Sequence, residues 1–272
     1  MAARPVRIGL LASSLEVYER MEDFLVPSAV SHVRRLELAR FVSRVGDAGA
    51  PDEYDLVLCE LGIPGPPNSV VFYPSQPSHL VREVLDSHSH LGIPLARRFY
   101  PFRRPVVDET IQTVSRENAL FAIATALPNV IPNIFELPWA ISEFASDSAF
   151  LTVNQIRMAF LIAAASNNPV GYGEQKGEIA SIIAGAFGWR ALARELVGKI
   201  PAGGGLIAKG AVAFAGTYVV GRSLERYHRL GYGYSHSERK QAYGVAFERG
   251  KHVVGAMVAA LKGKPQSAAG DS

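Results

Sequence analysis

The stretch GWRALARELVGKIPAGGGLIAKGAVAFAGTYVVGR, residues 188 to 222, decides how the second half of this chain folds. It is rich in glycine and alanine, yet it contains Arg190, Arg194 and Lys209. From Trp189 to the turn PAGGG, apolar residues recur at three- and four-residue spacing, and the two arginines lie on the opposite face. This pattern predicts a helix with one face toward water or lipid headgroups.

After the turn, the sequence predicts a second helix that is apolar nearly all round. Every fourth position there carries a small residue or a lysine, and these positions form a candidate helix-packing or partner-contact stripe: Gly205, Lys209, Ala213, Thr217 and Gly221. Small residues at this spacing let another helix approach closely. The segment is slightly short for a bilayer span and contains a lysine. A membrane span and a buried hairpin both remain open.

Composition limits the classes of function. Hydrophobic residues make up 48% of the 272 residues and charged residues 19%, below an average of about 25% charged residues in soluble domains. The net charge of +3 suits anionic lipid or an acidic partner and is too weak to indicate nucleic-acid binding. The single cysteine, Cys59, excludes an internal disulfide and favours a reducing, cytoplasmic setting.

The first part, residues 1 to 104, alternates strand-like and helix-like segments. We predict strands at VRIGLLAS, LELARFVS, YDLVLCEL and VVFYP, and helices at SLEVYERMEDFLVPSAVSHV and PSHLVREVLDSH. Alternating strands and helices predict a small, mostly parallel sheet of about four strands. The fold class expected for this part is therefore an α/β N-terminal domain.

The second part, residues 105 to 262, shows no convincing strand pattern. Predicted helices cover residues 106–127, 149–166, 174–200, 205–230 and 237–261, separated by turns rich in Pro, Gly or Asn. The last ten residues, 263–272, are polar, and we expect them to be disordered. The chain is thus predicted to be an α/β domain followed by an all-α, helical hydrophobic domain.

Residues 151 to 227 resemble the bacterial Domain of Unknown Function 697 family. The matching positions follow one another in order along that region: Thr152, Gln155, Met158, Gly188, Trp189, Arg190, Arg194, Pro201, Gly203, Gly204, Gly216, Thr217 and Gly221. The resemblance implies a helical module that is associated with membranes or with GTPases. It implies no established biochemical activity, and the first hundred residues carry no resemblance to a known family.

Motifs for nucleotide binding or catalysis do not occur in the sequence. No G-x-x-x-x-G-K-[ST] phosphate loop is present, and GGGLIAKG differs because its lysine precedes a glycine. His79, His88 and His90 are not accompanied by a cysteine or carboxylate cluster, so a surface loop is favoured over a metal site. We expect no catalytic residue, no cofactor and no metal site.

The stretch RRFYPFRRP interleaves arginines with aromatic residues at the boundary between the two parts. Together with Arg190 and Arg194, its arginines form a candidate membrane or partner surface: Arg97, Arg98, Arg103 and Arg104. The alternative is a domain junction in which the aromatic side chains pack and the arginines pair with Asp108 and Glu109. Both interpretations are compatible with the sequence.

Three hypotheses for function follow. The first is a non-enzymatic, membrane-associated adaptor or scaffold that works with a GTPase or another protein partner, in the bacterial cytoplasm or on the cytoplasmic side of the membrane. The second is a soluble homo-oligomeric helical protein. The third is an enzyme or ligand-binding protein that uses a cleft at the N-terminal sheet, where such sheets often bind ligands.

Overall fold

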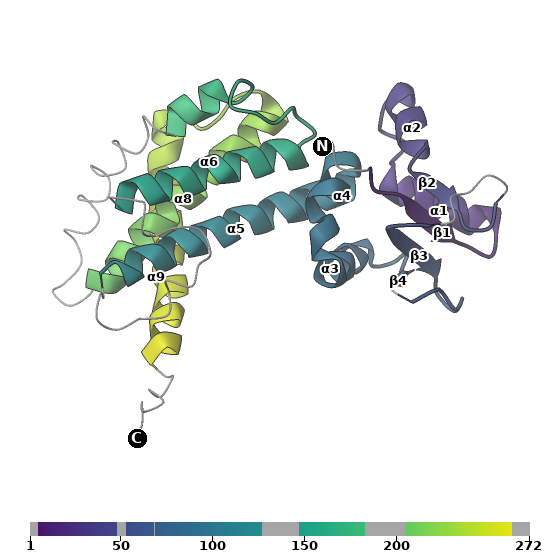
Figure 1. Cartoon of the computed structure of the whole chain (residues 1–272), viewed down its shortest axis with the longest axis horizontal. Coiled ribbons are helices and arrows are strands. Elements are labelled where there is room, and N and C mark those ends of the chain that lie inside the picture. Colours follow the sequence, from purple (N-terminus) through teal and green to yellow (C-terminus); the bar gives the residue numbers. More distant parts are fainter. Residues whose placement is uncertain (1–4, 48–52, 68, 127–146, 183–204, 263–272) are drawn as a thin grey trace, which may run out of the picture. The chain divides into compact units, whose positions relative to one another are not determined.

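The computed structural model describes residues 5–47, 53–67, 69–126, 147–182 and 205–262 (Figure 1). A small, all-parallel sheet near the N-terminus is followed by a mostly helical region. The predicted fold class is therefore confirmed. The chain divides into two compact units, of which the first, the α/β unit, contains Met1–Asp108 and Ala164–Asn168. The second, the helical unit, contains Glu109–Ala163 and Pro169–Ser272.

The sheet of the α/β unit has the strand order β2-β1-β3-β4, with every neighbouring pair parallel. Its strands are β1 (Ile8–Leu11), β2 (Val42–Arg44), β3 (Leu56–Glu60) and β4 (Ser69–Phe72). Ile8 pairs with Val42 on one side and with Leu56 on the other. The apolar runs of β1 and β3 fit this arrangement, because central parallel strands are buried on both faces.

Helices accompany the strands. They are α1 (Leu15–Leu25), α2 (His32–Ala39), α3 (Pro77–Ser87) and α4 (Gly92–Arg98), with a 3-10 turn at Ser89–Leu91. Helices α1 and α2 lie between β1 and β2 in the chain, and α3 and α4 follow β4. Helix α1 begins where the Ser14 hydroxyl accepts a hydrogen bond from the Val17 amide, as an N-cap serine does. Helix α3 begins with Pro77, whose missing amide hydrogen costs nothing in a first turn.

One predicted strand was wrong. The segment LELARFVS was expected to be extended, but its first four residues complete helix α2 and only Val42–Arg44 forms β2. Leu36 and Leu38 would share one face of a strand, whereas in a helix they point to different sides. Leu38 is 3% exposed and Leu36 is 59% exposed, so burial follows the helical and not the alternating pattern.

The described part of the helical unit contains four long helices. They are α5 (Tyr100–Ala124), which begins in the α/β unit, α6 (Asp147–Ala165), α8 (Gly205–Leu230) and α9 (His236–Lys262); residues 176–182 are also helical. The bounds of α8 agree with the prediction, and those of α6 and α9 lie within two residues of it. Helix α5 begins six residues earlier than expected and continues through Pro105.

Helices α8 and α9 form a tightly packed antiparallel hairpin. Its core contains small and aliphatic residues of α8 and mainly aromatic residues of α9: Ala211, Ala215, Val219, Tyr243, Ala246 and Phe247. A Cβ atom built on Gly250 of α9 lies 3.1 Å from the Ala211 carbonyl oxygen of α8. The two backbones therefore approach closely at this point. Helix α8 also contacts α5 and α6, which explains why it is apolar on several sides.

No helix in the described part of the chain has both the length and the apolar character needed to cross a bilayer.

Candidate functional site

Four uncharged polar side chains meet in the interior of the helical unit. Asn118 comes from α5, Asn154 and Gln155 from α6, and Thr217 from α8. All four are buried. We call these four residues the polar cluster. The three helices cross there, so each contributes its polar group to the same small volume.

Hydrogen bonds connect every member of the polar cluster. Asn118 Nδ2 donates to Thr217 Oγ1 at 2.7 Å, and Gln155 Nε2 donates to the same oxygen at 3.2 Å. Asn154 Nδ2 donates to Asn118 Oδ1 at 2.8 Å. Buried amides that bond one another in this way specify the register of their helices, because a slipped register leaves them unpaired.

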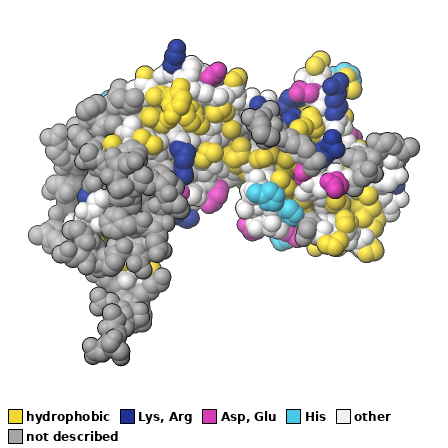
Figure 2. Space-filling view, viewed as in Figure 1, with side chains coloured by type: hydrophobic (Ala, Val, Ile, Leu, Met, Phe, Trp, Pro, Cys, Tyr) yellow, Lys and Arg dark blue, Asp and Glu magenta, His cyan; other side chains and the backbone are white. Residues whose placement is uncertain are grey.

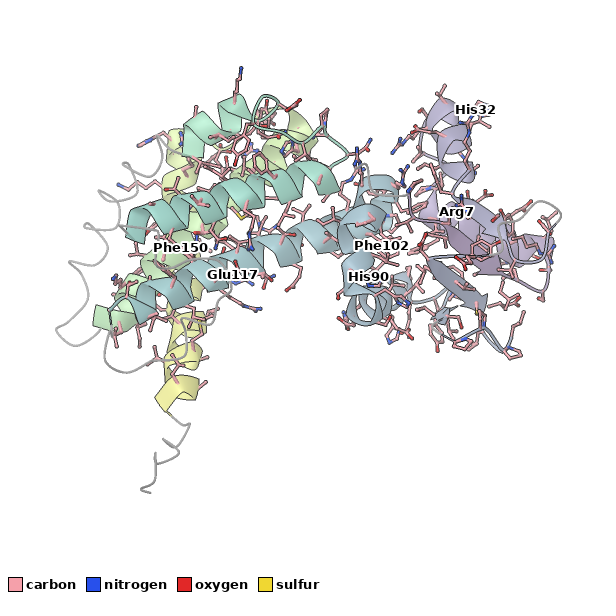
Figure 3. All side chains as sticks on the ribbon, in the orientation of Figure 1. Arg7, His32, His90, Phe102, Glu117 and Phe150 are labelled. Atoms are coloured by element: carbon pink, nitrogen blue, oxygen red, sulfur yellow. The ribbon has the colours of Figure 1, made fainter. Side chains whose placement is uncertain are left out.

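An ion pair lies at the edge of the polar cluster. Glu117 of α5 accepts hydrogen bonds from Asn154 Nδ2 and from Arg157 Nη2 of α6. Figure 3 shows Glu117 on α5 and Phe150 on the facing helix α6. Phe150 stacks on Phe121 with ring centroids 3.8 Å apart. The ion pair and the stacked rings join the same two helices on either side of the amides.

The polar cluster is suited to holding helices together. Amide and hydroxyl groups do not titrate near neutral pH, so they provide no general acid or base. The Asn154 Oδ1 atom is buried and accepts no hydrogen bond from the described residues. The amide orientation is fixed by Glu117, which can only accept, so this oxygen points away from the ionised carboxylate. The cluster is therefore a polar interior with one costly unsatisfied acceptor.

A second group of hydrogen-bonded polar residues lies at the turn between α8 and α9. The Ser235 amide donates to Glu238 Oε2 at 2.8 Å, and the Glu238 amide donates to Ser235 Oγ at 3.3 Å. This is a reciprocal capping box at the start of α9. Arg226 Nη1 of α8 donates to Glu238 Oε1 at 2.7 Å. The Ser235 and Arg226 bonds lower the pKa of Glu238 from 4.5 to about 2.

Replacing Glu238 with glutamine is expected to lower the melting temperature at neutral pH. The pKa of Glu238 is depressed in the folded state, so its stabilising effect is complete above about 4.5 and is lost as the pH falls toward about 2. The difference in melting temperature between variant and wild type should therefore shrink over that range. Glu248→Gln is the control, since Glu248 pairs with Lys251 on exposed helix surface. An equal effect of both variants would contradict the prediction.

The packing stripe is buried only in part. Ala213, Thr217 and Gly221 are buried, and a Cβ atom on Gly221 would lie 2.8 Å from Ile111 Cγ1. Gly205 is exposed, and a Cβ atom there would meet no atom within 4 Å. Lys209 Nζ donates to Thr125 Oγ1 of α5 at 3.0 Å. The close approach of helices is thus confined to the second half of the stripe.

The family-motif residues separate into two groups. Gln155 and Thr217 are bonded to each other, Gly216 is buried beside Thr217, and Thr152 lies at the start of α6. Other motif and surface positions lie outside the described residues: Gly188, Trp189, Arg190, Arg194, Pro201, Gly203 and Gly204. The structure therefore describes the part of the motif that borders the polar cluster.

The arginines of RRFYPFRRP differ in their surroundings. Arg98 lies over the Phe41 ring at 4.0 Å, and Arg103 Nε donates to the Ala96 carbonyl oxygen at 3.3 Å. Burial lowers the pKa of both guanidinium groups. Arg97 and Arg104 are exposed, whereas Arg98 and Arg103 are half-buried, so the first two are the more accessible charges of the stretch.

The aromatic residues of this stretch divide in the same way. Phe99 and Phe102 are fully buried, whereas Tyr100 is exposed. The stretch is thus partly packed core and partly surface of the α/β unit, which combines features of both sequence interpretations. Arg104 lies 3.9 Å from Asp108, a distance at which an exposed ion pair contributes little stability.

The carboxyl edge of the parallel sheet is occupied by a side chain of the chain itself. The chain goes from β1 to β2 on one side and from β3 to β4 on the other, so this edge is a topological switch point, where such sheets bind ligands. Glu60, at the end of β3, accepts a hydrogen bond of 2.7 Å from the Ser13 amide just before α1. Hydrogen bonds from Ser13 lower the pKa of Glu60. A carboxylate therefore already satisfies the amide that an anionic ligand would use.

The histidines are separate from this edge. Ser87 Oγ donates to the Glu83 carbonyl oxygen and lies 2.8 Å from His88 Nδ1, so the His88 ring is fixed by the end of α3. The rings of His88 and His90 lie 6.3 Å apart. Within the described ranges, no group of three or more His, Cys, Asp or Glu side chains is placed to hold a metal ion.

Sequence reasoning missed Asn118 and Glu117. The stretch VSRENALFAIATA places Asn118 one helical turn from the apolar residues Val114 and Ala122, on the face that also carries Ser115. A polar residue on the apolar face of an amphipathic helix indicates a buried hydrogen bond. This signal was available, but its partners on α6 and α8 depend on tertiary packing.

The fold and the cluster together define a class of protein: a small parallel α/β unit followed by a helical unit with a self-bonded polar interior. No known protein family, curated protein or solved structure matches this chain. The resemblance to the Domain of Unknown Function 697 family therefore stays a prediction that rests on the residues quoted above.

Proposed function

We propose that this protein is a non-enzymatic adaptor or scaffold that associates with the cytoplasmic side of a bacterial membrane. The observation that carries the proposal is the self-bonded polar cluster. Its amides and hydroxyl bond one another and leave no acid-base pair directed at a substrate. Polar groups used in this way hold three helices in one arrangement, as a scaffold requires.

Surface composition supports the membrane part of the proposal. The helical unit carries large exposed hydrophobic side chains on several elements: Val153, Val170, Tyr172, Tyr227, Leu230, Tyr232, Val245 and Leu261. Figure 2 shows hydrophobic side chains gathered on one face of the helical unit, with basic side chains beside them. Exposed apolar and basic groups together suit the interface of an anionic bilayer.

The proposed partner is a GTPase supplied by another chain. This part rests on the resemblance to the Domain of Unknown Function 697 family and on the missing phosphate loop in this sequence. The Glu60 carboxylate at the carboxyl edge of the sheet already accepts the hydrogen bond of the Ser13 amide, which supports a nucleotide site on the partner and not at this edge. Saturable GTP or ATP binding by the isolated chain would favour the enzyme hypothesis instead.

Fractionation of bacterial cells tests the proposal. The full-length chain is expected to sediment with membranes and to resist, in part, a high-salt wash, because hydrophobic contacts are not screened by salt. Complete recovery in the soluble fraction at low salt would contradict the membrane association. A monodisperse oligomer in that fraction would favour the soluble homo-oligomeric protein.

A further inference from the structure

The end of the α8–α9 hairpin presents apolar side chains to solvent. We call residues 222 to 240 the hairpin tip; they include the last turns of α8, the connecting turn and the first turn of α9. Tyr227, Leu230 and Tyr232 are exposed there by 45%, 45% and 56%. Tyr227 and Leu230 are three residues apart on α8, so they share one face of the helix.

The hairpin tip is also basic. Its sequence contains five arginine or lysine residues and two glutamates, a net charge of +3 within nineteen residues. The whole chain of 272 residues has the same net charge, so the rest of the chain is neutral in sum. Glu225 and Glu238 pair with Arg229 and Arg226, and the positive excess remains after these pairs are counted.

Several contacts hold the hairpin tip in one conformation. Gly231 has a φ of +84°, which favours glycine and ends α8. The Arg226 guanidinium lies 4.9 Å from the Tyr232 ring centroid and 5.3 Å from that of Tyr234. The Tyr234 amide donates to Ser223 Oγ at 3.0 Å. The exposed side chains therefore extend from an ordered turn, which lowers the entropy lost on binding.

We infer that the hairpin tip is the membrane contact of this protein and that it binds anionic phospholipid. This inference rests on the proposed function. Leu230 enters the boundary between headgroups and acyl chains, and the rings of Tyr227 and Tyr232 lie at headgroup level, where tyrosine is favoured. Arg239 and Lys240, at the start of α9, provide positive charge for lipid phosphates and carboxylates.

Charge complementarity favours anionic phospholipid, and not an apolar groove of another protein, as the binding partner of the hairpin tip. A groove for another protein would need only the exposed hydrophobic residues, whereas the concentration of the chain's net charge in nineteen residues matches an anionic surface. Burial lowers the pKa of His228, so this histidine adds no charge at neutral pH. The net positive charge of the tip therefore comes from its arginine and lysine residues.

Vesicle sedimentation of the full-length chain tests the inference. The vesicles contain phosphatidylcholine alone or phosphatidylcholine with phosphatidylserine. Wild type is expected to bind the second kind more strongly, and the tip variant Tyr227→Ser with Leu230→Ser to bind it about tenfold more weakly. The matched control is Tyr172→Ser with Val245→Ser, which removes one tyrosine and one aliphatic side chain that are more exposed and lie outside the tip.

A charge variant gives an independent readout. Lys240→Glu changes the net charge of the tip by two units without removing an apolar side chain. It is expected to remove most of the preference for phosphatidylserine and to leave weak binding to phosphatidylcholine unchanged. Thermal unfolding of each variant confirms that the fold is retained, since all these positions are on the surface or in the turn.

The outcomes separate the inference from the proposed function. If wild type binds the vesicles and both double variants bind equally well, the inference is wrong but membrane association still holds. Sedimentation with cell membranes without binding to protein-free vesicles would also overturn it, and would indicate a membrane-bound protein partner. Failure to sediment with cell membranes would instead contradict the proposed function. Weaker binding by the tip variant alone supports the inference.

Discussion

Replacing Asn118 with leucine is expected to lower the free energy of unfolding by about 3 kcal/mol. Leucine has a similar volume, so the change removes hydrogen bonds without leaving a large cavity. Thr217 Oγ1 then loses one donor and Asn154 Nδ2 loses one acceptor, both in the buried interior. Each of these atoms keeps one other partner, Gln155 Nε2 for Thr217 Oγ1 and Glu117 for Asn154 Nδ2, so the loss is that of two buried hydrogen bonds at about 1.5 kcal/mol each. Chemical unfolding of the full-length chain measures the difference.

Ser115→Ala is the matched control for this experiment. Ser115 is equally buried on the same helix, but its hydroxyl donates to the Ile111 carbonyl oxygen within α5. Its removal leaves no partner from another helix unpaired, and the expected loss is within about 1 kcal/mol. Similar losses for Ser115→Ala and Asn118→Leu would show that the polar cluster contributes no more than an ordinary buried hydroxyl.

Combining Asn118→Leu with Thr217→Val tests whether the two residues act together. If their hydrogen bond stabilises the fold, the double variant should lose less than the two single variants added together, by about 1 kcal/mol. Additive losses would mean that the hydrogen bond between Asn118 and Thr217 does not contribute to stability. The role assigned to the polar cluster in holding the helices together would then be wrong.

Replacing Gly221 with leucine is expected to lower the free energy of unfolding by about 3 kcal/mol through overpacking. Even a Cβ atom at Gly221 would lie 2.8 Å from Ile111 Cγ1 and 3.0 Å from Met158 Sδ. Those atoms belong to α5 and α6, so a leucine pushes both helices away from α8. Chemical unfolding of the full-length chain is again the measurement.

Gly255→Leu on α9 is the control with the opposite expected sign. A Cβ atom at Gly255 meets no atom within 4 Å. Leucine there should leave stability unchanged or raise it by up to about 1 kcal/mol, because glycine is a poor helix former. A loss at Gly255 as large as that at Gly221 would indicate that both effects arise from the backbone and not from packing.

Most elements of the fold followed from local patterns. Strands β1 and β3 and helix α8 were predicted correctly because each is a continuous apolar run in the sequence. Such runs occur where a strand is buried on both faces or a helix is buried on most sides. Segment LELARFVS was misassigned because eight residues fit both periods, and only the position of Leu38 against the sheet decides between them. The start of α5 was missed because Pro105, inside the helix, is a weak helix former whose cost the tertiary packing offsets.

The site was predicted only in part. Gln155 and Thr217 were singled out for different reasons, one as a family-motif residue and the other as a small residue in a packing stripe. They are hydrogen-bond partners, together with Asn118 and Asn154. Asn118 and Thr217 are 99 residues apart in the sequence, and no spacing rule connects positions on different helices at that separation.

The sequence by itself determined most of the helical and extended segments, the turns between them, and the collection of net positive charge between residues 222 and 240. These properties depend on neighbours within a few positions, such as the capping box of Ser235 and Glu238. Only the tertiary structure decided which polar groups are paired and which glycines are crowded. Pairing and crowding depend on atoms from other helices, so Gly221 and Gly255 differ in surroundings although both are helical glycines.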